Sequence, residues 1–137
     1  MSEKIKYAKS QAMFTFFFDS DFEPSVLGRM IGVNPSKIVL KKDAVVSPLN
    51  PKGHGFFQIS TNVADEPQTE IAVATILRVF IGKEDAILKI LNENNGYCVL
   101  DLFIKQTNGT IFPKISLSTN AIKVLSKLNA QFNLKLM

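Results

Sequence analysis

Few side chains in this sequence have the chemistry of catalysis or metal binding. The single histidine, His54, lies between two glycines, and the single cysteine, Cys98, lies within an apolar run. A lone histidine with no second histidine, cysteine or fixed acid near it in the sequence is neither a catalytic assembly nor a metal-ligand motif. We therefore predict no catalytic residue, no metal site and no cofactor. The sequence leaves catalysis undecided and favours a protein that is not an enzyme.

An acidic run, Asp19, Asp21 and Glu23, precedes Pro24 and a stretch with apolar residues at helical spacing. Carboxylates can bind a hard cation, but such sites need more oxygen ligands in a defined loop. Acidic side chains also favour the N-terminus of a helix, where they interact with the helix dipole. The run therefore predicts the entry to a short helix, with its charges on the surface.

Residues 41–55 contain two prolines and two glycines, together with three lysines and His54, which we expect to be exposed. This composition predicts a long surface loop between two strands. The loop and the acidic run are the most unusual charged segments of the chain, and they form our candidate partner surface. Its residues are Asp19, Asp21, Glu23, Lys41, Lys42, Lys52 and His54.

The overall charge limits the role of nucleic acid. The net charge is +4, but only two of the 16 basic residues are arginine, Arg29 and Arg78. Base readout and bidentate phosphate contacts favour arginine, so a sequence-specific nucleic-acid reader is disfavoured. Weak, non-specific binding through lysines remains an alternative. Those lysines are Lys4, Lys6, Lys9, Lys41, Lys42 and Lys52.

Length and hydropathy predict one globular domain in the cytoplasm. The 137 residues are 46% hydrophobic and 20% charged, which suffices for one core. No apolar run reaches the roughly 20 residues that cross a bilayer, and no apolar segment follows the charged N-terminus, so we expect neither a membrane span nor a signal peptide. The single cysteine excludes an intrachain disulfide and fits a reducing compartment.

The first strongly patterned segment is residues 13–18. Alternation places Phe14, Phe16 and Phe18 on one face, and the other face is also largely apolar. A strand that is apolar on both faces is expected in the interior of a sheet. Residues 1–12 are polar and unpatterned, and we expect a flexible lead-in there before a single domain over residues 13–137.

The remaining elements follow from periodicity and turn residues. Asn108-Gly109 predicts a hairpin between two strands, because both residues tolerate the positive φ of tight turns. Cys98 is expected to be a buried hydrophobe within the first of these strands. In order, we expect a strand at 13–18, a helix from Pro24 to Gly32, strands at 37–40 and 55–61, one kinked or two separate helices over 69–94, strands at 97–106 and 110–117, a helix from 118 or 119 to 128, and a strand at 130–136.

This order, β-α-β-β-α(α)-β-β-α-β, predicts an α+β domain with a mixed sheet and helices packed mainly on one face. Two strand–helix–strand units, residues 13–40 and 111–136, are each long enough to connect parallel strands by a crossover.

Several segments carry a resemblance to a known family. They are the stretch Leu27-Gly28-Arg29-Met30-Ile31-Gly32-Val33-Asn34-Pro35-Ser36, the Lys52-Gly53 loop before residues 56–61, and the closing stretches 115–118 and 125–134. With these segments, residues 13–136 resemble a bacterial family catalogued as domain of unknown function 4279. The resemblance implies no reaction and no site residues. It implies a small bacterial cytosolic protein, sometimes found in toxin-immunity or phage-related gene neighbourhoods.

The leading hypothesis is a non-catalytic protein-binding module, immunity-like or regulatory, whose partner the sequence does not identify. Weak nucleic-acid binding is the alternative. A third hypothesis is an enzyme whose site assembles from His54, Asp101 and Tyr97, which only the fold could bring together. Exposed edge strands could also support a homodimer by extension of the sheet.

Overall fold

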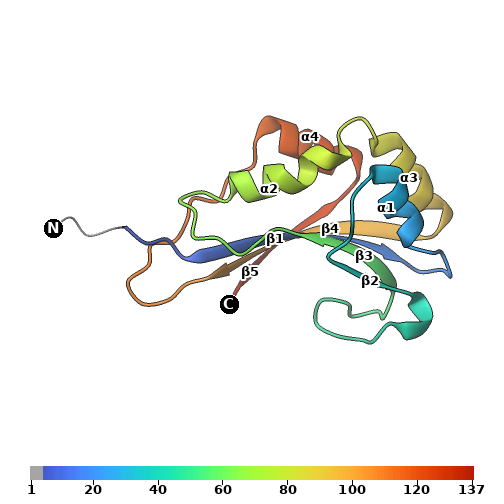
Figure 1. Ribbon diagram of the computed structural model, residues 1–137, viewed down its shortest axis with the longest axis horizontal. Helices are drawn as coiled ribbons and strands as arrows, with labels where there is room; N and C mark the ends of the chain where they lie inside the picture. The colour runs from blue at the N-terminus through green and yellow to red at the C-terminus, as the bar shows by residue number, and fades with distance from the viewer. Residues whose placement is uncertain (1–4) are drawn as a thin grey trace.

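The computed structural model describes residues 5–137 and has one five-stranded sheet with all four α-helices on the same face (Figure 1). The strand order is β2-β3-β1-β4-β5. This arrangement confirms the predicted α+β class and the one-sided helical layer. The elements are β1 (Lys9–Phe18), α1 (Ser25–Ile31), β2 (Lys37–Val39), η1 (Lys41–Asp43), β3 (Gly55–Ser60), α2 (Glu70–Leu77), η2 (Arg78–Phe80), α3 (Glu84–Glu93), β4 (Gly96–Lys105), α4 (Thr119–Lys127) and β5 (Gln131–Leu136).

The phenylalanine-rich strand β1 lies at the centre of the sheet, as its two apolar faces predicted. It pairs antiparallel with β3 on one side and with β4 on the other. Phe14, Phe16 and Phe18 are fully buried under the helices. Phe80 packs against this row, with its ring centroid 4.9 Å from that of Phe14 and 5.4 Å from that of Phe16. These rings are the centre of the core.

The first strand begins earlier than the expected residue 13. Strand β1 begins at Lys9, and Ala8 and Ala12 are buried. Residues 9–12 therefore belong to the sheet, although their polar composition has no strand pattern. Residues 1–4 lie outside the described part of the chain, so the expected flexibility of the lead-in stays a prediction.

The predicted hairpin at Asn108-Gly109 is wrong. Gly109 has φ +80°, as a tight turn requires, but residues 110–117 form no strand along β4. Both edges of β4 are already occupied, by β1 and by β5. The returning segment instead meets the N-terminal segment, where Ile111 N–H donates to the Lys6 carbonyl at 2.9 Å and its carbonyl accepts from Ala8 N–H at 2.8 Å. Pro113 also lacks the N–H that a paired strand would use.

The two predicted crossover units are also wrong. Strands β1 and β2 are not neighbours, because β3 lies between them. The one parallel pair is β4 with β5, and the helix in that connection is α4. The strand–helix–strand unit with parallel strands is therefore β4-α4-β5, and its first strand is not the segment that follows the Asn-Gly turn.

The helical region between β3 and β4 is two separate helices, one of the two forms that we expected. Gly82, with φ +84°, lies in the break between η2 and α3. Helix α4 begins at the predicted cap, where Ser118 Oγ accepts from Ala121 N–H at 3.1 Å. None of the helices in residues 5–137 has both the length and the apolar character of a membrane-crossing helix.

Candidate binding face

The face of the sheet opposite the helices carries a row of aromatic side chains. The register places Phe17 of β1 opposite Phe56 of β3 and opposite Tyr97 of β4, so all three share this face. The Phe17 and Tyr97 rings stack with centroids 5.1 Å apart, and the Phe17 and Phe56 centroids are 5.9 Å apart. Phe17 is buried, whereas Phe56 and Tyr97 are partly accessible. The row provides an apolar floor across three strands.

The long connection between β2 and β3, residues 40–54, lies on this face (Figure 1). We call it the β2–β3 loop. Two hollows lie between it and the sheet, a larger one of about 310 Å³ towards β2 and β3 and a smaller one of about 180 Å³ towards β4 and β5. Phe17 and Leu49 line both hollows, so they lie adjacent. We call this loop and the two hollows together the candidate binding face, or binding face for short.

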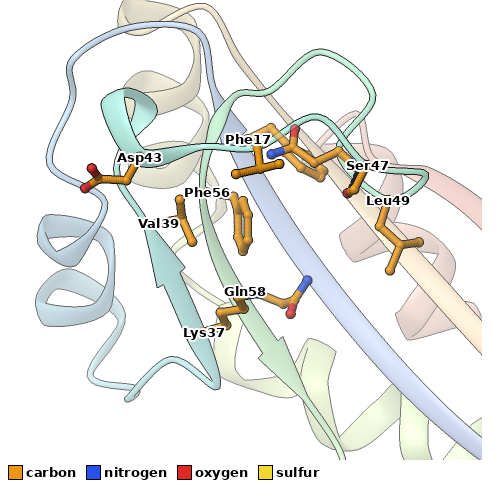
Figure 2. Close-up of a pocket in the computed structure, with 10 residues that line it drawn as sticks. Phe17, Lys37, Val39, Asp43, Ser47, Leu49, Phe56 and Gln58 are labelled. Carbon is orange, nitrogen blue, oxygen red and sulfur yellow. Dashed lines mark hydrogen bonds between the residues drawn. The ribbon is translucent and has the colours of Figure 1, made fainter.

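The larger hollow is mostly apolar (Figure 2). Phe56 lies on its floor between Val39 and Phe17, and Leu49 closes one side. Lys37 lies at one end, with its Nζ 5.9 Å from the Phe56 ring centroid. Gln58 donates from Nε2 to Thr15 Oγ1 at 3.0 Å, so this amide is held in place at the floor. Lys37 and Asp43 both line this hollow, so an apolar group can enter here beside charges of both signs.

The smaller hollow is more polar and holds a buried carboxylate. Asp101 lies on β4, directly opposite Asn133 of β5, and Lys135 lines the same hollow. Burial raises the pKa of the Asp101 carboxyl, and Asn133 and Lys135 beside it offset part of this rise. The ionised Asp101 carboxylate is therefore less stable in the folded protein than in water.

The β2–β3 loop is held by its own buried asparagine. Asn50 Nδ2 donates to the His54 carbonyl at 2.8 Å, and Asn50 Oδ1 accepts from the His54 N–H at 3.0 Å. A turn at Ser47–Asn50 closes the loop tip with two backbone hydrogen bonds of 3.1 and 3.0 Å. At the loop base, a Cβ on Gly55 would lie 2.8 Å from the Lys41 nitrogen, so the position needs glycine. The loop is thus preorganised without a partner.

Three of the predicted surface residues meet at the base of this loop. Asp19 Oδ1 lies 3.2 Å from Lys41 Nζ and 3.6 Å from His54 Nε2. The expectation that His54 is exposed is wrong, because its ring packs edge-on against Tyr97, with centroids 5.8 Å apart, and is buried. Burial first, and the charge of Asp19 second, raise the pKa of Tyr97. The cluster ties the loop to the end of β1.

The other predicted surface residues are more dispersed. Lys52 lies over the Tyr97 ring, with Nζ 6.0 Å from the centroid, and so borders the same cluster. Lys42 is exposed on the loop, whereas Asp21 and Glu23 are exposed on the connection to α1. Glu23 Oε1 accepts a 3.5 Å hydrogen bond from Ser25 N–H at the start of that helix, the local role that its position predicted.

Sequence reasoning missed the aromatic row and the exposed apolar residues Val45, Val46 and Leu49 of the β2–β3 loop, which we call the apolar loop tip. Phe17 and Phe56 lie on the strand faces opposite the core, so nothing local shows that the fold places them in one row with Tyr97. The loop tip did have a signal, because Val45 and Val46 are adjacent apolar residues within a polar, proline-containing segment. Both side chains are strongly exposed.

The three side chains of the enzyme hypothesis, His54, Tyr97 and Asp101, do not all line one hollow. Tyr97 and Asp101 both line the smaller hollow, whereas His54 contacts the Tyr97 ring but lines neither hollow. Cys98 points to the helical side, where its Sγ donates to the Leu128 carbonyl at 3.5 Å, and burial raises its pKa to about 12. This confirms Cys98 as a buried hydrophobe. Among residues 5–137, no group of three or more histidine, cysteine or acidic residues is placed to hold a metal ion.

Residues 6–137 match the family described as Domain of unknown function (DUF4279). The chain belongs to this family. The match extends over almost the whole chain and confirms the family that the sequence resembles. Comparison of this DUF4279 chain with curated proteins and with solved structures found no match.

Proposed function

We propose that this DUF4279 protein is a non-catalytic protein-binding module, of the regulatory or immunity-like kind that acts by occupying a partner's surface. Its contact surface is the β2–β3 loop together with the larger hollow. The observation that carries the proposal is the loop tip, where Val45, Val46 and Leu49 are 76%, 68% and 43% exposed. Exposed clusters of large apolar side chains beside a hollow are typical of protein interaction sites.

The structure of the loop supports binding without a large conformational cost. The Asn50 hydrogen bonds, the Asp19 contacts and the close approach at Gly55 hold the loop before any partner arrives. Preorganised segments lose less conformational entropy on association than mobile ones. The apolar tip can therefore contribute most of its burial to affinity.

The surrounding charges indicate the chemistry of the partner. Lys37, Lys42 and Lys52 are exposed on or beside the binding face. A partner that fits would place an apolar side chain over Phe56 and carboxylates near these lysines. Charge complementarity of this kind increases the association rate and selects among partners.

The apolar tip also separates this proposal from nucleic-acid binding. Bases stack on accessible aromatic rings, but Phe17 is buried and Phe56 and Tyr97 are only partly accessible, whereas Val45 and Val46 of the loop are strongly exposed. Aliphatic side chains contribute no stacking platform. We therefore assign the lysines to a protein partner, and nucleic acid becomes an outcome of the test.

The test is affinity capture of the tagged protein from a lysate of its source organism, with and without nuclease, read by mass spectrometry. The informative variant is Val46→Asp. The matched control is Val63→Asp, at a similarly exposed valine between β3 and α2. We expect one stoichiometric protein that survives nuclease, is retained by Val63→Asp and falls at least about tenfold with Val46→Asp, since both burial and charge complementarity are lost.

Two outcomes contradict the proposal. Capture that is equal for the two variants would remove the loop tip from the interface. Recovery of proteins only when nuclease is absent would assign the lysines to nucleic acid instead.

A further inference from the structure

Strand β5 forms an open edge of the sheet. It pairs with β4 on one side, and the strand order ends with it. Just after the strand, Met137 N–H donates to the Ile104 carbonyl of β4 at 2.9 Å. Because backbone groups of successive strand residues point to opposite sides, the N–H and C=O groups of Phe132, Leu134 and Leu136 point away from β4. These are the groups that another strand would bind.

The same three residues carry the apolar side chains of β5. The register places Phe132 opposite Leu100 and Leu134 opposite Leu102, both fully buried on the helical side of the sheet. The apolar row of the core thus continues to β5 and ends there in solvent. Phe132, Leu134 and Leu136 are 38%, 42% and 68% exposed.

This edge lacks the usual protection against pairing. Exposed edges are commonly short, interrupted by proline or a bulge, or charged on the inward side. The opposite edge, β2, has three residues and carries Lys37. Strand β5 has six residues and no proline, and its one charge, Lys135, lines the smaller hollow on the other face of the sheet. Of the two edges, β5 is therefore the one suited to strand addition.

We propose that β5 pairs antiparallel with β5 of a second copy, about a twofold axis at Leu134. The outward backbone groups are spaced symmetrically about this residue, so Leu134 lies opposite itself and Phe132 lies opposite Leu136 of the other copy. In antiparallel pairs, such residues exchange both hydrogen bonds. The pairing satisfies the outward groups of all three residues.

The side chains match in this register. Apolar residues face apolar residues on the helical side, and on the other face Lys135 lies opposite Asn133 of the second copy, not opposite another lysine. Like charges directly opposite each other would oppose pairing, and this register avoids them. An interface that uses the same surface on both copies closes at two chains. This self-complementarity is why we assign the edge to a second copy.

The dimer would change the binding face as well. The two five-stranded sheets become one continuous sheet, with all the helices on one side. Gln131, Asn133 and Lys135, which line the smaller hollow, come next to their equivalents. The two smaller hollows then lie side by side across the axis, and the protein presents two β2–β3 loops on the same face.

The test measures mass by light scattering and sedimentation over a range of protein concentrations. The chain has a mass of 15.2 kDa, so the dimer has twice this value. We expect the wild-type protein to be dimeric, and Leu134→Lys and Leu134→Glu each to weaken the dimer by about tenfold or more, because each places like charges opposite each other. Mixing the two variants should restore a dimer with one copy of each, since the charges at position 134 then attract.

Controls separate this inference from misfolding and from the proposed function. Circular dichroism spectra should match those of the wild type, and Ile71→Lys, at a similarly exposed site on α2, should remain dimeric. Val46→Asp should also remain dimeric, so loss of partner capture and loss of dimer are distinguishable. A wild-type monomer at every concentration, a dimer unaffected by Leu134→Lys, or failure of the mixture to pair would overturn the proposal.

Discussion

Asn50 is the residue on which the shape of the β2–β3 loop most depends, and its replacement by alanine tests the loop's structure directly. Its side chain makes two hydrogen bonds to the backbone of His54, and both residues are buried. In Asn50→Ala, the N–H and the carbonyl of His54 lose their partners. A buried polar group left without a partner costs about 1–3 kcal/mol. Because part of the loop can rehydrate, we expect a loss of about 2–4 kcal/mol in the free energy of unfolding.

Two measurements follow this loss. Urea denaturation gives the global free energy of unfolding, and limited trypsin digestion gives local opening, since Lys52 lies between Asn50 and His54. We expect a lower urea midpoint and faster cleavage after Lys52 in Asn50→Ala. A loosened loop should also weaken capture of the proposed partner, because the apolar tip is no longer preorganised.

The matched control is Asn62→Ala, at an exposed asparagine in the connection between β3 and α2. Surface substitutions of this kind change stability by about 0.5 kcal/mol or less. If Asn50→Ala behaved like this control in both assays, the two hydrogen bonds to His54 would not be what holds the loop.

Three further predictions concern the core and the buried titratable groups. Phe80→Ala should lower the free energy of unfolding, measured by urea denaturation, by about 3–5 kcal/mol, because it opens a cavity beside Phe14 and Phe16. A loss below about 1 kcal/mol would contradict this packing. Cys98, with a pKa raised to about 12 and a buried Sγ, should react with a thiol reagent at neutral pH only after denaturation, and rapid labelling of the folded protein would contradict its burial. Asp101→Asn should raise the thermal midpoint at neutral pH, because the raised pKa of Asp101 means that its ionised form is more stable in the unfolded chain than in the folded one. Below the ordinary aspartate pKa of about 3.9, the carboxyl is protonated in both states, so the gain in midpoint should disappear. A gain in midpoint that persisted below that pH would have to come from another source.

Some of the architecture could be predicted from local pattern alone. The alternation of Phe14, Phe16 and Phe18 with a second apolar face indicated a central strand, and β1 is central. Ser118 indicated the start of α4, and Gly82 indicated a break between two helices. These features depend on backbone geometry and on the period of apolar residues, which nearby residues determine.

Other local signals were outweighed by distant contacts. Asn108-Gly109 does form a turn, but no strand follows it, because β5 occupies the edge of β4 that a hairpin would need. His54 lies between glycines and was expected to be exposed. It is buried because Asn50 holds its backbone and Tyr97, 43 positions later in the chain, covers its ring.

By itself, the sequence determined the α+β class, the central apolar strand, the one-sided helical layer and the burial of Cys98, since these follow from which residues must leave water and at what spacing. Only the tertiary structure decided that Phe17, Phe56 and Tyr97 form one row, that Asp19, Lys41 and His54 meet, and that the apolar side of β5 ends at an open edge. The physical reason is that strand order and register are chosen by hydrogen bonding and packing between segments far apart in the chain. No local spacing records which segments those will be.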